Sequence, residues 1–106
     1  MIVINNFQII SMEFRNNKKE FRFEAVLEDG AYATLTYRWL KGNMVIMQTL
    51  VPAAYRGKGA GSALAAHVLG YAREQHLKVI IYCPFTEMYV KEHPEYNDLI
   101  LEKPKR

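Results

Sequence analysis

The spacing of apolar residues changes near residue 51, and this change constrains the fold more than any other feature of the sequence. Before it, residues 21–27 and 33–39 alternate apolar and polar side chains with a period of two, which predicts half-buried strands. The Asp29-Gly30 pair between them is typical of a tight hairpin turn. A third run, residues 44–51, is nearly all apolar or β-branched, which predicts a strand buried on both faces. Together these runs predict an antiparallel meander.

The second half of the chain has helical spacing. Pro52 ends the third run because proline has no N–H to donate to a strand ladder. Small and apolar residues then recur at intervals of three and four, which predicts a helix over residues 59–75. A short strand over residues 77–83 and a second helix over residues 85–92 follow. A strand, a crossover helix and another strand imply a parallel pair.

These elements predict an α/β (α+β) fold in which an antiparallel meander is followed by a glycine loop, a helix, a parallel strand and a short helix. A length of 106 residues suits a single domain covering residues 1–106. Residues 1–18 would form an N-terminal extension, with an extra strand over residues 8–14 and a turn at residues 16–17.

Composition excludes several function classes. The formal net charge is only +3, and the lysines and arginines are spread along the chain, so there is no basic stripe for a nucleic acid. No apolar run approaches the roughly 20 residues that span a membrane, and the first residues do not resemble a signal peptide. A single cysteine cannot form an internal disulfide. We therefore expect a cytoplasmic protein with no membrane or nucleic-acid partner.

The segment over residues 56–62 has the composition of a phosphate-binding loop. Gly57, Gly59 and Gly61 allow backbone N–H groups to approach an anion closely, and Arg56 and Lys58 add positive charge. The following helix would contribute its unpaired N–H groups and the positive end of its dipole. The alternative is a glycine loop that only caps the helix.

Two common nucleotide motifs do not fit this loop. The Walker pattern requires a lysine directly after the last glycine, where this chain has Ser62. The dinucleotide pattern requires a third glycine three positions after the second, where this chain has Ser62 or Leu64, depending on which glycines are counted. The preceding meander is also not the βαβ unit that such a motif needs.

The loop resembles the signature Arg/Gln-x-x-Gly-x-Gly/Ala of the GNAT superfamily of N-acetyltransferases. The matching residues are Arg56-Gly57-Lys58-Gly59-Ala60-Gly61. Further motifs are similar to the short YjdJ-type branch of that superfamily: Val51-Pro52, Gly61-Ser62, Leu64, Cys83 and His93-Pro94-Glu95-Tyr96. The resemblance extends over roughly residues 21–101.

This resemblance implies a minimal GNAT-like fold that binds acetyl-coenzyme A without a metal. The pantetheine arm would pair with the backbone of Leu50 and Val51, one of whose N–H groups would polarise the thioester carbonyl. Arg56 and Lys58 would bind phosphates. The pyrophosphate would rest on the N–H groups of the loop, formed by Gly57, Lys58, Gly59, Ala60, Gly61 and Ser62.

The resemblance also suggests three catalytic candidates: Cys83, Gln48 and Tyr89. Cys83 would accept the acetyl group transiently or give a proton to the departing thiolate, unless it is a buried structural thiol. Gln48 stands where members of the branch usually carry histidine, and an amide cannot act as a general base. Tyr89 would protonate the coenzyme sulfur, unless it only packs.

We therefore expect direct acetyl transfer from acetyl-coenzyme A to a small-molecule or protein amine. Direct transfer is favoured over an acetyl-Cys83 intermediate because Gln48 leaves the thiol without an activating base. One alternative is a non-catalytic module that binds coenzyme A or an acyl derivative. Another is a small protein-interaction domain. The oligomeric state and the acceptor's identity stay open.

Overall fold

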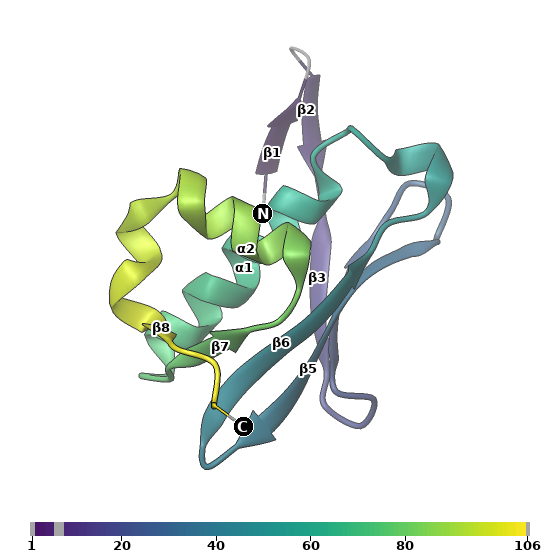
Figure 1. The fold of residues 1–106 in the computed structure, drawn as a ribbon. Helices are drawn as coiled ribbons and strands as arrows, with labels where there is room; N and C mark the ends of the chain where they lie inside the picture. The colour runs from purple at the N-terminus through teal and green to yellow at the C-terminus, as the bar shows by residue number, and fades with distance from the viewer. Residues whose placement is uncertain (1, 6–7, 106) are drawn as a thin grey trace.

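Six strands form one sheet in the order β3-β4-β5-β6-β7-β8 in this computed structural model (Figure 1). The structure describes the backbone of residues 2–5 and 8–105 and the side chains of residues 12–105. Strands β1 and β2 pair with each other in a separate two-stranded sheet. The strands are β1 (Ile2–Asn5), β2 (Gln8–Ser11), β3 (Glu13–Asn17), β4 (Arg22–Val26), β5 (Tyr32–Leu40), β6 (Asn43–Leu50), β7 (Val79–Ile81) and β8 (Ile100–Leu101).

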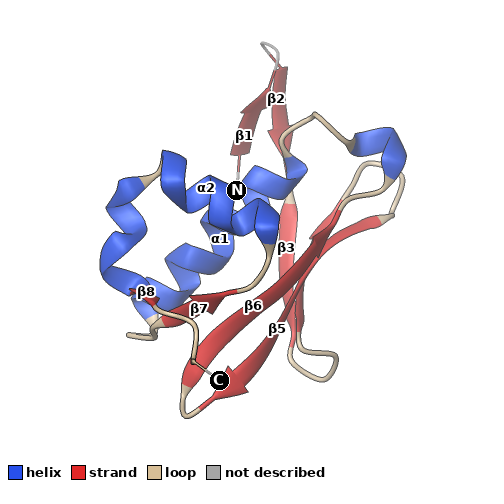
Figure 2. Ribbon diagram, in the orientation of Figure 1, coloured by secondary structure: helices blue, strands red, loops and turns tan. Residues whose placement is uncertain are grey.

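The helical elements connect the parallel strands. They are the 3-10 helix η1 (Ala53–Tyr55), α1 (Ala60–Glu74), α2 (Pro84–Glu92) and the 3-10 helix η2 (Pro94–Leu99). Strands β3 to β6 pair antiparallel, whereas β6-β7 and β7-β8 are parallel. The sheet advances in one direction from β6 to β8, so right-handed crossovers place α1 and α2 on the same face (Figure 2). The predicted α/β fold is confirmed.

The hydrophobic core lies between this face and α1. Phe23 of β4 and Leu35 of β5 are completely buried, as are Leu64 and Leu69 of α1. Alternate residues of each strand point to this face because the side-chain period of a strand is two. The opposite face, which we call the open face, carries the other set, including Glu24 and Thr36.

Glu24 is a buried carboxylate on the open face. Only 5% of the residue is exposed, and its Oε2 accepts hydrogen bonds from Asn17 Nδ2 at 3.1 Å and Arg22 Nε at 2.7 Å. The hydrogen bond from Asn17, helped by Arg22, lowers the pKa of Glu24 although burial acts to raise it. These contacts tie β3 to β4 on this face.

The prediction that residues 44–51 are buried on both faces is wrong for their second half. Met44, Val45 and Ile46 are buried, but Met47, Gln48 and Leu50 are exposed. β7 pairs with β6 only as far as Ile46, so the rest of β6 has no strand beside it on that edge among the described residues. A register shift against β5 between Thr36 and Tyr37 falls at the same level.

The N-terminal prediction also needs correction. The predicted strand over residues 8–14 is divided between β2 and β3, and the turn follows Asn17 instead of lying at residues 16–17. Asn16 and Asn17 stay in β3 because their side chains bond across the sheet: Asn16 Oδ1 accepts a hydrogen bond from the Tyr37 hydroxyl at 2.7 Å, and Asn17 donates to Glu24.

The strand predicted over residues 77–83 covers only residues 79–81, and β8 was not predicted. Neither α1 nor any other helix of the described residues combines the length and apolar character that a membrane crossing requires.

Candidate functional site

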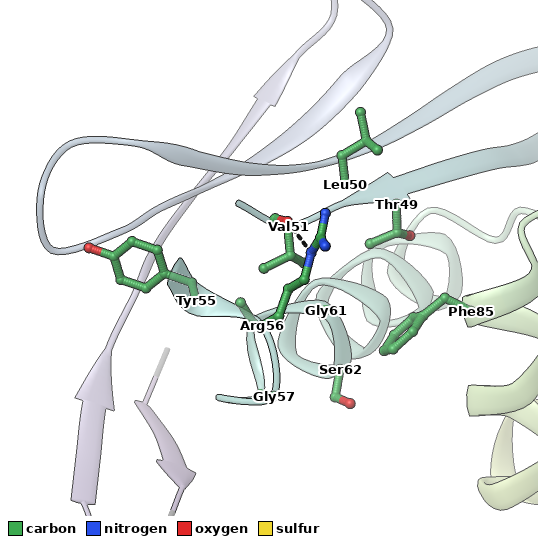
Figure 3. Close-up of a pocket in the computed structure, with 11 residues that line it drawn as sticks. Thr49, Leu50, Val51, Tyr55, Arg56, Gly57, Gly61, Ser62 and Phe85 are labelled. Carbon is green, nitrogen blue, oxygen red and sulfur yellow. Dashed lines mark hydrogen bonds between the residues drawn. The ribbon is translucent and has the colours of Figure 1, made fainter. Parts of the chain in front are cut away.

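A pocket of about 570 Å³ lies where β6 separates from β7, beside the N-terminus of α1 (Figure 3). The second half of β6 forms one wall, the loop after it forms the floor, and the start of α2 forms the opposite wall. The lining residues are Thr49, Leu50, Val51, Tyr55, Arg56, Gly57, Gly59, Ala60, Gly61, Ser62 and Phe85.

Eight of the nine residues predicted to bind the coenzyme line this pocket. The exception is Lys58, whose ammonium nitrogen lies 5.7 Å from the centroid of the Tyr55 ring. The side chain of Arg56 turns back toward β6, and its Nε donates a hydrogen bond to the carbonyl oxygen of Val51 at 3.2 Å (Figure 3). The guanidinium therefore stands beside the pocket with its terminal nitrogens as further donors.

The N-terminus of α1 has the features of an anion site. Its N-cap is Gly59 in the left-handed region, with φ of 91°, and no side chain that the structure describes forms a capping hydrogen bond. No acidic residue lies in the first turn. The first intrahelical hydrogen bond runs from Ala63 N to Gly59 O at 2.9 Å, so the N–H groups of the three preceding residues have no intrahelical acceptor.

Gly61 allows the two walls of the pocket to approach each other. A Cβ at this position would lie 2.9 Å from Cζ of Phe85, closer than real Cβ contacts allow. The Phe85 ring is 43% exposed and reaches from the start of α2 toward α1 (Figure 3). The missing side chain at Gly61 therefore makes room for the aromatic ring of Phe85.

The opening between β6 and β7 begins at one carbonyl group. Ile46 O accepts hydrogen bonds from Tyr82 N at 2.9 Å and Cys83 N at 3.2 Å. Beyond this point β6 continues without a strand partner on that side in the described part of the chain. Among the described residues, this part of β6 is therefore an edge of the sheet on the β7 side, and its last two residues, Thr49 and Leu50, line the pocket.

Cys83 is not one of the lining residues; it lies behind one of them, Thr49. It is 2% exposed, and its Sγ lies 3.3 Å from Thr49 Oγ1. Burial acts to raise the pKa of the thiol, but hydrogen bonding from Thr49, Thr86 and the backbone of Phe85 outweighs burial and lowers the pKa. The thiol thus sits among donors that favour its ionised form.

Thr86 completes this group of donors. Its Oγ1 is completely buried and has no partner of good hydrogen-bond geometry among the described residues. Hydrogen bonding by the Thr86 side chain is nevertheless one of the causes that lower the pKa of Cys83. Because a buried hydroxyl without a partner costs free energy, the sulfur is its natural acceptor.

Like Cys83, the other two catalytic candidates are not among the residues that line the pocket. Gln48 is exposed on the open face, where it pairs with Thr36 of β5. Tyr89 stacks on His93 with 4.1 Å between ring centroids and lies 6.2 Å from the Tyr96 ring. Burial, together with Tyr96 and Glu95, raises the pKa of Tyr89 to about 12.

Three lining residues were not predicted from the sequence: Thr49, Tyr55 and Phe85. Thr49 could have been found, because a period of two puts it on the opposite face from Gln48. The position of Phe85 depends on how α2 packs against α1, which no local pattern encodes. No three His, Cys, Asp or Glu side chains of the described residues come together as a metal site would require.

The family model and the relatives found by comparison with known proteins agree with each other. The family model described as GCN5-related N-acetyl-transferase matches residues 22–99. Protein NATD1 of Gallus gallus is 40% identical over 63 residues, which cover 58% of this chain and 57% of that protein. The chain thus matches little more than half the length of that relative. Protein NATD1 of Danio rerio is 33% identical over 95 residues, covering 85% of this chain and 86% of the relative.

A solved structure has the same architecture. The solution structure of a GCN5-like candidate N-acetyltransferase from Staphylococcus aureus superimposes with a TM-score of 0.67 and 29% sequence identity. The match covers 89% of this chain and 92% of that one.

Proposed function

From the premise that the chain belongs to the GCN5-related N-acetyltransferase family, we propose that it binds acetyl-coenzyme A in the described pocket and transfers the acetyl group to an amine. The observation that carries this proposal is the pocket itself, which joins an uncapped helix N-terminus to an unpaired strand edge. The narrower resemblance to the YjdJ-type branch stays a prediction.

The residues present fit the coenzyme. Its pyrophosphate needs several donors, and the N–H groups of Ala60, Gly61 and Ser62 point out of the first turn of α1. Arg56 adds a guanidinium that suits a phosphate. The amides of the pantetheine arm would pair with the free edge of β6 as an added strand does.

Acetyl-coenzyme A, when bound, supplies the acetyl group as a thioester. A backbone N–H of Leu50 or Val51 would donate to the carbonyl oxygen, where negative charge develops. The attacking amine must be neutral, and Gln48 cannot remove its proton, so that proton leaves through water. The buried Cys83 would act on this site through Thr49, whose hydroxyl lies between the thiol and the pocket.

Direct transfer predicts that Cys83→Ala retains activity. We expect a reduction in kcat of about tenfold or less, because the thiol contributes a hydrogen bond and not a covalent bond. Release of coenzyme A in the presence of a lysine analogue measures this rate. A fall of this rate to background, with acetyl-coenzyme A binding unchanged, would instead indicate an acetyl-Cys83 intermediate.

Calorimetric titration with acetyl-coenzyme A tests the proposal directly. We expect saturable binding that the Arg56→Ala, Lys58→Ala double variant weakens by about tenfold or more, since each charged donor to a phosphate contributes about 1.5–3 kcal/mol. The matched control, Lys18→Ala with Lys19→Ala, removes the same charge from the β3–β4 turn and should bind normally. Absence of binding at millimolar acetyl-coenzyme A would contradict the proposal.

Two observations support a second candidate, a non-catalytic module that binds coenzyme A or an acyl derivative. Gln48 has an amide side chain, which cannot titrate, and Tyr89 is not among the residues that line the pocket. Tight binding without turnover of any amine would favour this alternative. In either case the single buried thiol of Cys83 is compatible with a reducing compartment such as the cytoplasm.

A further inference from the structure

Tyr82 lies beside the opening between β6 and β7, with its side chain on the open face. Its neighbours Ile81 and Cys83 belong to the core on the helix side, so the alternation of the strand turns Tyr82 to the other side. Its N–H bonds to Ile46 O, where the two strands last meet. The Tyr82 side chain is 43% exposed. An acceptor that approaches the end of the pocket from the open face would therefore meet this ring.

The chain's own Lys103 is placed on this ring. Its ammonium nitrogen lies 5.3 Å from the centroid of Tyr82 and 3.6 Å from Oε2 of Glu87, which comes from the first turn of α2. Lys103 belongs to the segment after β8, which runs toward the β5–β6 hairpin (Figure 1). An aromatic face and a carboxylate thus hold one alkylammonium group together.

This pair of groups has the chemistry to capture an amine acceptor in its protonated form, before the amine loses its proton and reacts. An alkylamine has a pKa of about 10.4 and arrives at neutral pH as a cation. A protein with a net charge of +3 does not attract cations as a whole. Local recognition is therefore required, and a tyrosine face with an adjacent carboxylate provides it through a cation–π contact and an ion pair.

We propose that Tyr82 and Glu87 form the acceptor's ammonium subsite, that the acceptor is an alkylamine of the lysine type, and that Lys103 occupies this subsite as an intramolecular competitor. This inference rests on the proposed function, since it concerns the acceptor of the same site. A group tethered by a short segment has an effective concentration on the order of millimolar. A free amine must compete with that concentration to bind.

Binding of a lysine analogue tests the subsite independently of turnover. The probe is Nα-acetyl-lysine methylamide, titrated into protein saturated with coenzyme A and followed by the NMR signals of the Tyr82 ring. Lys103→Met should lower the apparent Kd by about twofold to fivefold, the range expected for such contacts. Lys105→Met, which removes a lysine two positions further along the same segment, should leave it unchanged.

The subsite itself is tested in the Lys103→Met background, where no tethered amine competes. There Glu87→Gln should raise the Kd of the lysine analogue by about twofold to fivefold. The same change should not affect an aniline, which is uncharged at neutral pH. Tyr82→Leu, followed through the signals of Met88, should also weaken the lysine analogue.

Failure of this inference is distinguishable from failure of the proposed function. Normal binding of acetyl-coenzyme A, with an affinity for the lysine analogue that none of the three substitutions changes, would overturn the subsite alone. An equal effect of Glu87→Gln on the lysine analogue and on the aniline would also overturn it. If the unmodified protein does not bind acetyl-coenzyme A, both the subsite and the proposed function are overturned.

Discussion

At the scale of single residues, Gly61 and Gly70 occupy the same helix but have different surroundings. Gly61 faces the Phe85 ring, and a Cβ there would lie 2.9 Å from its Cζ. Gly70 has no atom within 4 Å of such a Cβ. Both lie within α1, where glycine is less favourable than alanine.

Replacing each glycine by alanine should therefore distinguish a glycine needed for acetyl-coenzyme A binding from one that affects only the free energy of unfolding. Gly70→Ala should raise the free energy of unfolding by about 0.5–1 kcal/mol and leave acetyl-coenzyme A affinity unchanged. Gly61→Ala gains the same helix propensity, but the exposed Phe85 ring must move, so the net stability change should be smaller. Its coenzyme affinity should fall by about fivefold or more, equivalent to about 1 kcal/mol. Urea unfolding and calorimetry measure the two quantities, and equal affinities would contradict the assigned role of Gly61.

The residue scale also shows what the local sequence could not predict. The glycine motif forms the pocket floor, and a loop followed by a helix could be predicted there because glycine spacing and helical spacing are local properties. It did not indicate that Lys58 lies over Tyr55, or that Thr49 joins Cys83 to the pocket. Both arrangements depend on contacts between side chains from different elements.

At the scale of elements, β3 and β4 are held together on the open face by the buried carboxylate of Glu24. Its pKa is lowered in the folded chain, chiefly by the hydrogen bond from Asn17. A lowered pKa means that the carboxylate stabilises the fold above its unfolded pKa of about 4.3. This contribution is lost as the pH falls through the folded value.

Glu24→Gln should therefore destabilise the protein at neutral pH by about 1.5–3 kcal/mol, the range for a hydrogen bond to a charged group. The difference between the two proteins should shrink as the pH falls below about 4, because the wild-type carboxyl then becomes neutral as well. Urea unfolding at a series of pH values measures it. A difference that is independent of pH would show that the charge of Glu24 is not what stabilises the strand pair.

The strands of the meander could be predicted because their alternation and turn residues are local features of the sequence. The extent to which β6 is buried could not be predicted in this way. Its apolar composition indicated burial on both faces, yet residues 47–50 lose their neighbour where β7 stops. The end of β7 lies more than 30 positions later in the chain. The short β8 was missed for a related reason: two residues carry no measurable periodicity.

At the scale of the whole molecule, the sheet consists of two parts with different connections. Strands β3 to β6 follow one another through tight turns, whereas β7 and β8 join through the crossovers that contain α1 and α2. Among the described residues, α1 and α2 cover one face of the sheet. The proposed ammonium subsite lies at the opening between the two parts, because it combines Tyr82 on the other face with Glu87 from the first turn of α2.

The place of the pocket between these two parts has a consequence for the order of folding. Hairpins between successive strands close short loops, whereas the pairing of β6 with β7 must close a loop that includes all of α1. The meander can therefore form early and rapidly, but Phe85 reaches Gly61 only after the slow, long-range pairing is complete. Recovery of coenzyme binding during refolding would then lag behind formation of the antiparallel strands and report the last step of folding.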